Sequence, residues 1–250
     1  MGWWPRLRVQ AAFGRALDLI FPPQTLDDAD RPLSEGLSGQ AWSRISFIAE
    51  PLCDSCGAPF EYAMAERCAA CMARPRAFGR ARAAVSYDEH SRDLILAFKH
   101  ADRLDLARLF SGWIGRAAAD LLAEADAVAP VPLHPLRLIR RRYNQAAEIA
   151  RPLARRHGLT YLPDVLIRRR ATDSQGGKSG AGRRRNVAGA FVVPQGRRRR
   201  VEGRRIVLID DVLTTGATAE ACAKALLAAG AAAVDLAVVA RVREADAEPI

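Results

Sequence analysis

Short apolar runs recur along the chain after residue 82, and longer stretches with helical periodicity separate them. Five runs have the length and composition of buried strands: 83–87, 127–131, 190–193, 206–209 and 234–240. Four stretches predict helices: 91–99, 106–124, 144–157 and 217–229. Strands that alternate with helices are typical of a doubly wound sheet, whose ligands bind at the carboxyl ends of the strands. The pattern therefore predicts an α/β fold with a parallel sheet flanked by helices.

The residues before this repeating pattern are less regular. Phe13, Leu17 and Ile20 fall on one helical face, whereas 22–52 is rich in Pro, Asp, Gly and Ser. Composition divides the chain into three expected parts: an N-terminal helix and connector (1–50), a small cysteine module (51–79) and the main domain (80–250). Within the main domain, 172–186 contains four glycines and predicts a long loop.

Membrane insertion is not expected. Hydrophobic residues make up 50% of the chain, but no uninterrupted apolar run reaches the roughly 18 residues of a membrane-spanning helix. Near the N-terminus, Arg15 and Asp18 interrupt what would be the apolar core of an export signal. We therefore expect a cytoplasmic protein without a membrane span.

Basic residues are concentrated in one segment. The net charge of the chain is +10, yet 137–205 alone holds 20 Lys or Arg against 4 Asp or Glu, a surplus of 16. The remainder of the chain therefore has a net charge of −6. A solvated face explains such a surplus as well as an anionic partner does, so charge by itself does not choose between them.

A predicted strand leads into two acids and a threonine-rich turn. The run 206–209 stops at Asp210-Asp211, and Thr214-Thr215-Gly216-Ala217-Thr218 then opens an alanine-rich helix. A helix N-terminus presents unpaired backbone N–H groups and a positive partial charge, so a phosphate there gains several hydrogen bonds. The two acids suit the hydroxyls of a ribose, directly or through hydrated magnesium (Mg2+). The sequence has no Walker lysine motif and no GxGxxG, which argues against an ATPase or dinucleotide site.

The stretch Val207–Thr218 resembles the PRPP-binding signature of type I phosphoribosyltransferases. The resemblance implies a ribose 5-phosphate diphosphate such as PRPP as the ligand, with the acids on the ribose and the turn on the 5-phosphate. The implied contacts are Asp210, Asp211, Thr214, Thr215, Gly216, Ala217 and Thr218. The alternative is an ordinary strand-to-helix turn in which Asp and Thr act only as caps.

A second turn follows the predicted strand at 127–131. Its residues Pro132, Leu133 and His134 stand where such folds place the loop that binds pyrophosphate, and Lys99 ends a predicted helix. We take these four residues as candidate pyrophosphate contacts. The alternatives are a proline-stiffened turn for the loop and a helix cap for Lys99.

Four cysteines form two close pairs, Cys53 with Cys56 and Cys68 with Cys71, separated by eleven residues. Thiolates in two CxxC pairs can complete a tetrahedral shell around zinc (Zn2+). Four protein ligands leave no open position for water or substrate, so the expected role is structural. Disulfides are the alternative, but a chain without an export signal is expected to meet reducing conditions.

A wider set of motifs resembles the ComF family, which is linked to DNA uptake in naturally competent bacteria. The matching residues are the cysteine pairs, the acid–threonine turn, Phe98-Lys99, Val131-Pro132-Leu133-His134, Arg142-Tyr143-Asn144-Gln145, Ser174-Gln175 and Arg184-Arg185-Asn186. The chain departs from the family at Gln24-Thr25-Leu26-Asp27, near which family members often carry a further cysteine pair, and at Lys178, where leucine is common. The resemblance implies a PRPP-binding protein with competence proteins among its partners.

Eight residues are candidate contacts for single-stranded DNA: Arg140, Arg141, Arg142, Tyr143, Asn144, Arg183, Arg184 and Arg185. Arginines bind phosphates bidentately, and the ring of Tyr143 can stack on a base. For the first cluster, the alternative is a solvated helix start with Tyr143 packed inward. The second cluster lies in 172–186, and related transferases close such a loop over the substrate.

Three functions fit these motifs. The first is a PRPP-binding, phosphoribosyltransferase-like protein that handles single-stranded DNA during DNA uptake and natural transformation. The second is an active phosphoribosyltransferase in nucleotide metabolism, in which Mg2+ and basic side chains would stabilise the pyrophosphate leaving group. The third is a non-catalytic protein that senses PRPP. The sequence shows no recognisable acceptor pocket or general base, so no catalytic residue is assigned.

Overall fold

The computed structural model of the protein describes residues 37–62, 66–100, 103–170 and 187–242. The chain divides into two compact units between Arg44 and Ile45. The described part of the first unit contains one short helix, α2 (Gly39–Arg44), and the Ser38 hydroxyl caps it by accepting a 3.1 Å hydrogen bond from the Ala41 N–H. The expected N-terminal helix lies outside the described residues. The second unit holds both the cysteines and the sheet, and the boundaries expected from the sequence stay predictions.

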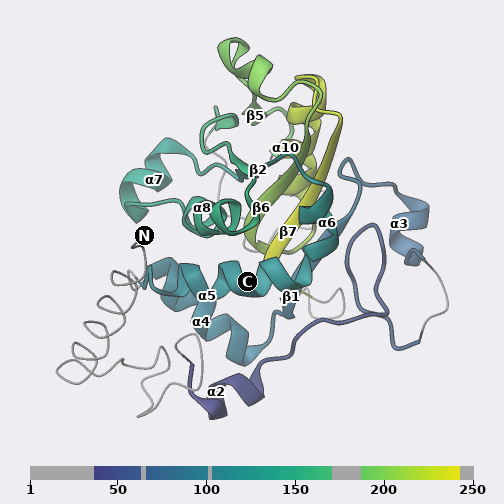
Figure 1. The fold of residues 1–250 in the computed structure, drawn as a ribbon, viewed down its shortest axis with the longest axis vertical. Helices are drawn as coiled ribbons and strands as arrows, with labels where there is room; N and C mark the ends of the chain where they lie inside the picture. Colours follow the sequence, from purple (N-terminus) through teal and green to yellow (C-terminus); the bar gives the residue numbers. More distant parts are fainter. Residues whose placement is uncertain (1–36, 63–65, 101–102, 171–186, 243–250) are drawn as a thin grey trace, which may run out of the picture. The chain divides into compact units, whose positions relative to one another are not determined.

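A five-stranded parallel sheet forms the centre of the second unit (Figure 1). Its strands stand in the order β1-β7-β6-β2-β3, and all neighbouring pairs are parallel. Their bounds are β1 (Ala81–Ser86), β2 (Ala127–Pro130), β3 (Thr160–Tyr161), β6 (Arg205–Leu213) and β7 (Ala233–Arg241). The central strands are nearly continuous apolar runs because helices cover both faces of such a sheet.

Alternate residues of the strands pack against different helices. One face packs on α10 (Ala217–Ala228), and the buried cluster there includes Ile206, Leu208, Leu236, Val238, Cys222 and Leu226. Helices α5 (Leu106–Ala117) and α8 (Gln145–His157) pack side by side over the other face (Figure 1). The carboxyl edge of the sheet, where ligands bind in such folds, is the end at which β6 reaches Leu213 and β7 reaches Arg241.

The remaining elements connect the strands or cover their ends. Helix α4 (Glu89–His100) begins with a reciprocal cap, in which the Ser91 N–H donates to Asp88 Oδ1 and the Asp88 N–H donates to Ser91 Oγ, both at 2.9 Å. Two short strands, β4 (Ile167–Arg168) and β5 (Phe191–Val192), form a separate antiparallel pair. The other bounds are α3 (Ala69–Ala73), α6 (Ala119–Glu124), α7 (Pro135–Arg141) and the 3-10 helix η1 (Gln195–Arg200).

The expected α/β fold, with a parallel sheet flanked by helices, is confirmed. Three details of the expectation are wrong. The run 190–193 forms β5 outside the parallel sheet, because a short apolar run does not reveal its pairing partner. The stretch 106–124 is two helices, since the chain turns at Ala118, where φ is −112°. Strand β6 continues to Leu213, so the two acids expected after the strand lie within it.

The helices in the described ranges are too short or too polar to cross a membrane. The longest of them, α8, has 13 residues, compared with the roughly 20 apolar residues of a spanning helix.

Candidate functional site

The turn Thr214–Gly216 between β6 and α10, called the phosphate loop below, has the geometry of an anion-binding turn. Gly216 ends it with φ 77°, a left-handed conformation that favours glycine, and α10 begins at the next residue. A Cβ on Gly216 would lie 3.4 Å from Nη1 of Arg76 and 3.6 Å from Cδ1 of Leu213. Space alone would therefore admit a Cβ, and it is the positive φ that favours glycine at the N-terminus of this 12-residue helix.

The phosphate loop retains polar groups without protein partners. Thr215 Oγ1 is buried and forms no hydrogen bond within the described part of the chain. The first N–H groups of α10 lack acceptors within the helix, as at every helix start. Five of the expected contacts line one small cavity: Asp210, Thr214, Gly216, Ala217 and Thr218. An anion with several acceptor oxygens in this cavity would accept hydrogen bonds from the N–H groups at the start of α10, so the loop suits a phosphate.

The two acids beside the phosphate loop have different environments. Asp211 forms an ion pair with Lys99, with 3.1 Å between Oδ2 and Nζ. Asp210 accepts a 2.9 Å hydrogen bond from the Asp211 N–H. Burial and the neighbouring Asp211 carboxylate raise the pKa of Asp210 to about 8, although Lys99 and Arg168 oppose the change. The protonated form of Asp210 is therefore favoured more than in an exposed aspartate, and a divalent cation such as Mg2+ would favour the charged form.

The expected pyrophosphate loop leaves the sheet beside the acids. The Val131 N–H donates to the Ile209 carbonyl at 2.9 Å, so this loop begins level with the acidic pair. His134 ends it as the N-cap of α7, where His134 Nδ1 accepts a 3.3 Å hydrogen bond from the Leu136 N–H. Asn144 donates through Nδ2 to the Val131 carbonyl at 3.0 Å and holds the loop from the start of α8. Between these anchors lie two further expected contacts, Pro132 and Leu133.

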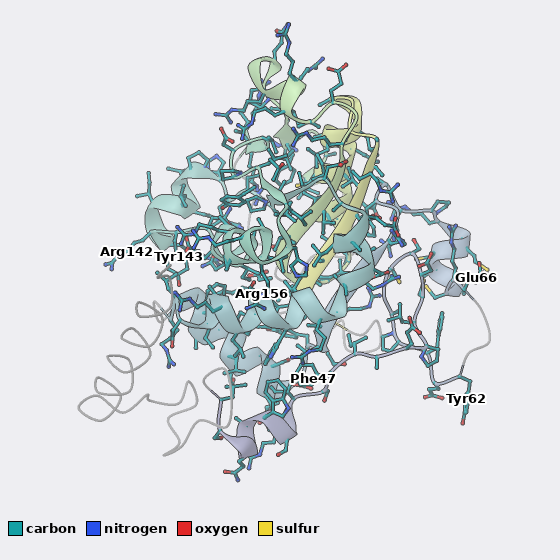
Figure 2. All side chains as sticks on the ribbon, viewed as in Figure 1. Phe47, Tyr62, Glu66, Arg142, Tyr143 and Arg156 are labelled. Atoms are coloured by element: carbon teal, nitrogen blue, oxygen red, sulfur yellow. The ribbon has the colours of Figure 1, made fainter. Side chains whose placement is uncertain are left out.

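The first arginine cluster surrounds the end of α7. Arg142 is exposed and adopts a left-handed φ of 63° where α7 ends (Figure 2). Arg141 Nη1 lies 3.5 Å from Gln145 Oε1. The Tyr143 hydroxyl donates to the Phe98 carbonyl at 2.5 Å, and the two ring centres are 6.3 Å apart. Tyr143 is therefore packed inward, which is the arrangement considered as the alternative to base stacking.

Some expected DNA contacts cannot be placed in this arrangement. The side chain of Arg140 lies outside the described part of the chain, as does the whole 172–186 stretch with its three arginines, Arg183, Arg184 and Arg185.

Arg168 is a candidate site residue that the sequence did not reveal. It lies on β4, is 7% exposed, and its guanidinium carbon stands 5.3 Å from the centre of the Phe191 ring. Its charge acts to lower the pKa of Asp210, so the two groups are close enough to interact. Burial, and after it the charge of Arg137, lowers the pKa of Arg168 itself. The residue opens a run of three arginines, a pattern more typical of a solvated surface, so no motif marked it.

The four cysteines, Cys53, Cys56, Cys68 and Cys71, converge on one point. Their sulfur atoms lie within 4.8 Å of one another, and the Cys56 and Cys68 sulfurs are 3.7 Å apart. A tetrahedral zinc with Zn–S bonds of about 2.3 Å separates its sulfurs by about 3.8 Å, so the cluster fits this metal. All four are free thiols. Burial would raise the pKa of Cys53, but backbone hydrogen bonds from Cys68 and Cys56 outweigh it and lower the pKa to about 7.

Two arginines of the sheet hold the cysteine module. Arg82 on β1 donates to both the carbonyl and the carboxylate of Asp54, at 3.1 Å in each case. Arg241 at the end of β7 is 5% exposed and donates to the Cys56 carbonyl at 2.6 Å. A Cβ on Gly57, which has φ 69°, would meet a strand carbonyl at 2.5 Å. The module therefore packs directly on the sheet.

The chain is similar to known proteins over most of its length. A family model described as phosphoribosyl transferase domain matches residues 144–250, which include both acids and the phosphate loop. Competence protein F of Haemophilus influenzae is 30% identical over 181 residues, covering 70% of this chain and 78% of that protein. DNA utilization protein YhgH of Escherichia coli K12 is 31% identical over 200 residues, covering 78% of this chain and 86% of that protein.

One solved structure with similarity is a glutamine phosphoribosylpyrophosphate (PRPP) amidotransferase from B. subtilis complexed with ADP and GMP. It is 24% identical, with a TM-score of 0.36. The match covers 57% of this chain and 30% of that enzyme, so the chain spans less than a third of its length.

The curated relatives and the domain match coincide with the motifs described above. The similarity to competence protein F and to YhgH extends over more than two thirds of each relative. The domain match begins at Asn144 and covers β6, α10 and β7, which build the acidic pair and the phosphate loop. The chain therefore belongs to the ComF family and carries a phosphoribosyltransferase domain, as its motifs predicted.

Proposed function

We propose that the protein binds PRPP, or a closely related phosphoribosyl diphosphate, together with Mg2+ at the carboxyl edge of the sheet. The strongest support is the Thr215 hydroxyl, which is buried and has no partner in the described residues, in a loop that ends at the left-handed Gly216. Buried polar groups are normally hydrogen-bonded, so an orphan donor beside a helix N-terminus favours an anion as the missing partner. The phosphoribosyl transferase domain match covers the same loop.

Each part of this site would act on one part of the ligand. The 5-phosphate would accept hydrogen bonds from the first N–H groups of α10 and from Thr215 Oγ1. Asp210 and Asp211 would accept hydrogen bonds from ribose hydroxyls and would hold hydrated Mg2+, because carboxylate oxygens and water are its usual ligands. Lys99, which pairs with Asp211, would bring positive charge towards the pyrophosphate. When bound, Mg2+ would neutralise part of the charge on that group.

We also propose that the cysteine module holds one structural Zn2+ through its four thiolates. The spacing of the sulfurs fits a closed tetrahedral site, which leaves no position for a substrate. Such a site needs reduced thiols, in keeping with the cytoplasmic location expected from the sequence.

A second proposed activity is the binding of single-stranded DNA on the α7 side of the carboxyl edge. The relatives carry the names competence protein and DNA utilization protein. Arg142 is exposed at the end of α7, and Leu136 and Ile139 of the same helix are 67% and 77% exposed. Arginine contacts to phosphates give an affinity that is independent of sequence and falls steeply with salt.

Replacing Thr215 by valine tests the phosphate proposal. Valine keeps the shape of the side chain but removes the hydroxyl, so the ligand-free protein should gain about 1 kcal/mol because a buried unpaired group is lost. The affinity for magnesium PRPP, measured by isothermal titration calorimetry, should fall about tenfold, the effect of one hydrogen bond to a charged group. Thr160→Val on the edge strand β3 is the matched control and should change neither quantity. Unchanged affinity in Thr215→Val would exclude this hydroxyl from the phosphate site.

Pyrophosphate release separates the three functions. The protein is incubated with magnesium PRPP, with and without candidate nucleobases. Release that depends on a base identifies an active phosphoribosyltransferase in nucleotide metabolism. Binding without release identifies a protein that binds or senses PRPP, and its affinity for single-stranded DNA then separates these two.

A further inference from the structure

A short segment after the last cysteine of the module, residues 72–76 and called the arm below, contacts the phosphate loop. It follows Cys71 and carries Arg74 and Arg76. Only 12% of the Arg76 side chain is exposed, and its Nη1 donates to the Thr215 carbonyl at 2.9 Å and to Glu220 Oε1 at 3.0 Å. Arg74 Nη2 donates to the other carboxylate oxygen of Glu220 at 2.5 Å. Two residues of the arm thus contact the first turn of α10 or the loop before it.

The hydrogen bond to Thr215 fixes the orientation of one peptide in the phosphate loop. The Thr215 C=O and the Gly216 N–H belong to the same planar trans peptide, in which the two groups point in opposite directions. Because Arg76 holds the carbonyl on its own side, the Gly216 N–H is directed to the opposite side of the loop. Gly216 lines the small cavity at the loop, and a Cβ on it would lie 3.4 Å from Arg76 Nη1. The guanidinium therefore supports the loop through its hydrogen bond to the Thr215 carbonyl.

The arm also brings guanidinium groups to the first turn of α10 and the loop before it. Glu220 is 5% exposed and is shared by two guanidinium groups, so its single carboxylate neutralises only one of them. Burial would lower the pKa of Arg76, but interactions with Glu220 and with Cys71 raise it, and the group stays charged. In surroundings of low dielectric constant, a fixed cation beside a helix N-terminus strengthens the attraction for an anion.

The cysteine module has other contacts to the sheet and to α10 besides those of Arg76. Arg74 already pairs with Glu220, and Arg82 and Arg241 hold the first cysteine pair. Of these four arginines, only Arg76 donates to the backbone of the phosphate loop. Its position is therefore explained better by the loop than by attachment.

We propose that Arg76 is a positioning residue for the phosphate loop, through which the metal-bound cysteine module sets the affinity of the site for phosphorylated ligands. This inference rests on the proposed function, because it concerns the same ligand and the same loop. It assigns the module a part in ligand binding in addition to its structural role.

Calorimetric titration of the full chain with magnesium PRPP tests the role of Arg76. Arg76→Gln should lower the affinity about tenfold, and Arg76→Lys, which keeps the charge but only one contact, should recover part of the loss. Arg74→Gln is the matched control, since it loses a contact to the same carboxylate without touching the loop, and should stay within about twofold of wild type. Equal affinities in Arg76→Gln and Arg74→Gln would overturn the inference. A wild-type protein that does not bind PRPP would overturn the proposed function instead.

Metal removal distinguishes positioning from a general loss of structure. Metal content and circular dichroism are recorded for every variant. Chelation of the wild-type protein should lower PRPP affinity about tenfold, whereas chelation of Arg76→Gln should add little, because both changes remove the same restraint. If Arg76→Gln does not fold, the chelation experiment is carried out with Arg76→Lys instead. Losses that simply add would show that the metal and Arg76 act independently, and the inference would be wrong.

Discussion

The two edges of the sheet differ in how completely their polar groups are paired within the described residues. At the amino edge, where the strands begin, Glu124 accepts hydrogen bonds from Arg80 at 2.8 Å and from Arg205 at 2.7 Å. At the carboxyl edge, the pKa of Asp210 is raised to about 8 and the Thr215 hydroxyl has no partner in the described residues. Groups that pair with one another support the fold, whereas a buried hydroxyl without a partner, such as that of Thr215, is available to a ligand. The carboxyl edge, where open α/β sheets bind their ligands, therefore keeps a buried unpaired group that costs stability in the absence of a ligand.

The arginines of the basic segment 137–205 are likewise divided between the amino and the carboxyl edge. Helix η1 precedes β6 at the amino edge, where Arg200 pairs with Asp164 at 2.7 Å and Arg197 donates to the Asp164 carbonyl. Helix α7 follows β2 at the carboxyl edge and ends at the exposed Arg142. The described arginines of 137–205 therefore lie at both edges and do not form one surface. A net charge by itself overstates the size of a nucleic-acid interface.

Removal of the metal should change stability more than the other changes below. It tests whether the amino edge keeps its structure when the cysteine module unfolds. Binding energies of about 10 to 16 kcal/mol in comparable zinc sites are largely folding energy, so chelation should unfold the cysteine module. The sheet and the ion pairs around Glu124 should survive, because the strands are buried against their own helices and Glu124 pairs with Arg80 and Arg205. Circular dichroism should show retained helices, and elemental analysis of protein purified without added metal should find about one zinc per chain. Four alkylatable thiols with no metal would contradict the zinc assignment.

Replacing arginines at the carboxyl edge should weaken DNA binding more than replacing arginines at the amino edge. Replacing Arg140, Arg141 and Arg142 by Gln should weaken binding of single-stranded DNA, and each lost phosphate contact should flatten the slope of log K against log salt by about 0.7. The matched control replaces the exposed Arg198 and Arg199 of η1 and should change both quantities much less. Fluorescence anisotropy across a salt series measures both. Absence of binding even at low salt would refute the DNA proposal and leave the transferase or sensor function.

A smaller effect should appear in the pH dependence of stability. The pKa of Asp210 is raised from 3.8 to about 8, so between these values the folded protein holds a proton that the unfolded chain has released. Its contribution to the free energy of unfolding should therefore fall as pH rises through this range, and Asp210→Asn should remove the fall. The Tm of Asp210→Asn minus the Tm of wild type should therefore increase from about pH 5 to about pH 8. Parallel curves for the two proteins would contradict the raised pKa.

Glu124 at the amino edge should show the opposite sign. Its hydrogen bond with Arg80 lowers the pKa of Glu124, so its contribution is present at neutral pH and is lost only as pH falls into the acid range. Thermal melts of Glu124→Gln should therefore differ from wild type at neutral pH and converge with it in acid.

Short contiguous motifs made much of the fold and the site predictable. Four of the five strands of the sheet were predicted from their apolar runs, because parallel strands are buried on both faces. The acids, threonines and glycine of 210–218 and the two cysteine pairs likewise carry their geometry within a few residues. Such motifs depend on local backbone conformation, which the sequence determines directly.

Contacts between distant segments were not predictable. The hydrogen bond from Arg76 to Thr215 joins residues 139 positions apart, and no local pattern marks either end of it. Strand β3 has only two residues, too few to show a period. Helix α7 exposes Leu136 and Ile139 instead of burying one face, so it lacks the amphipathic pattern that identifies a surface helix.

The central claim, that the carboxyl edge binds magnesium PRPP, is tested most directly by calorimetric titration of one variant from each edge. We expect wild type and Glu124→Gln to bind with the same affinity. The double variant Asp210→Asn, Asp211→Asn should melt cooperatively but give no measurable heat of binding, because it has lost the carboxylates for the ribose and for Mg2+. Undiminished binding by the double variant, or an equal loss in Glu124→Gln, would contradict the assignment of the ligand to the carboxyl edge.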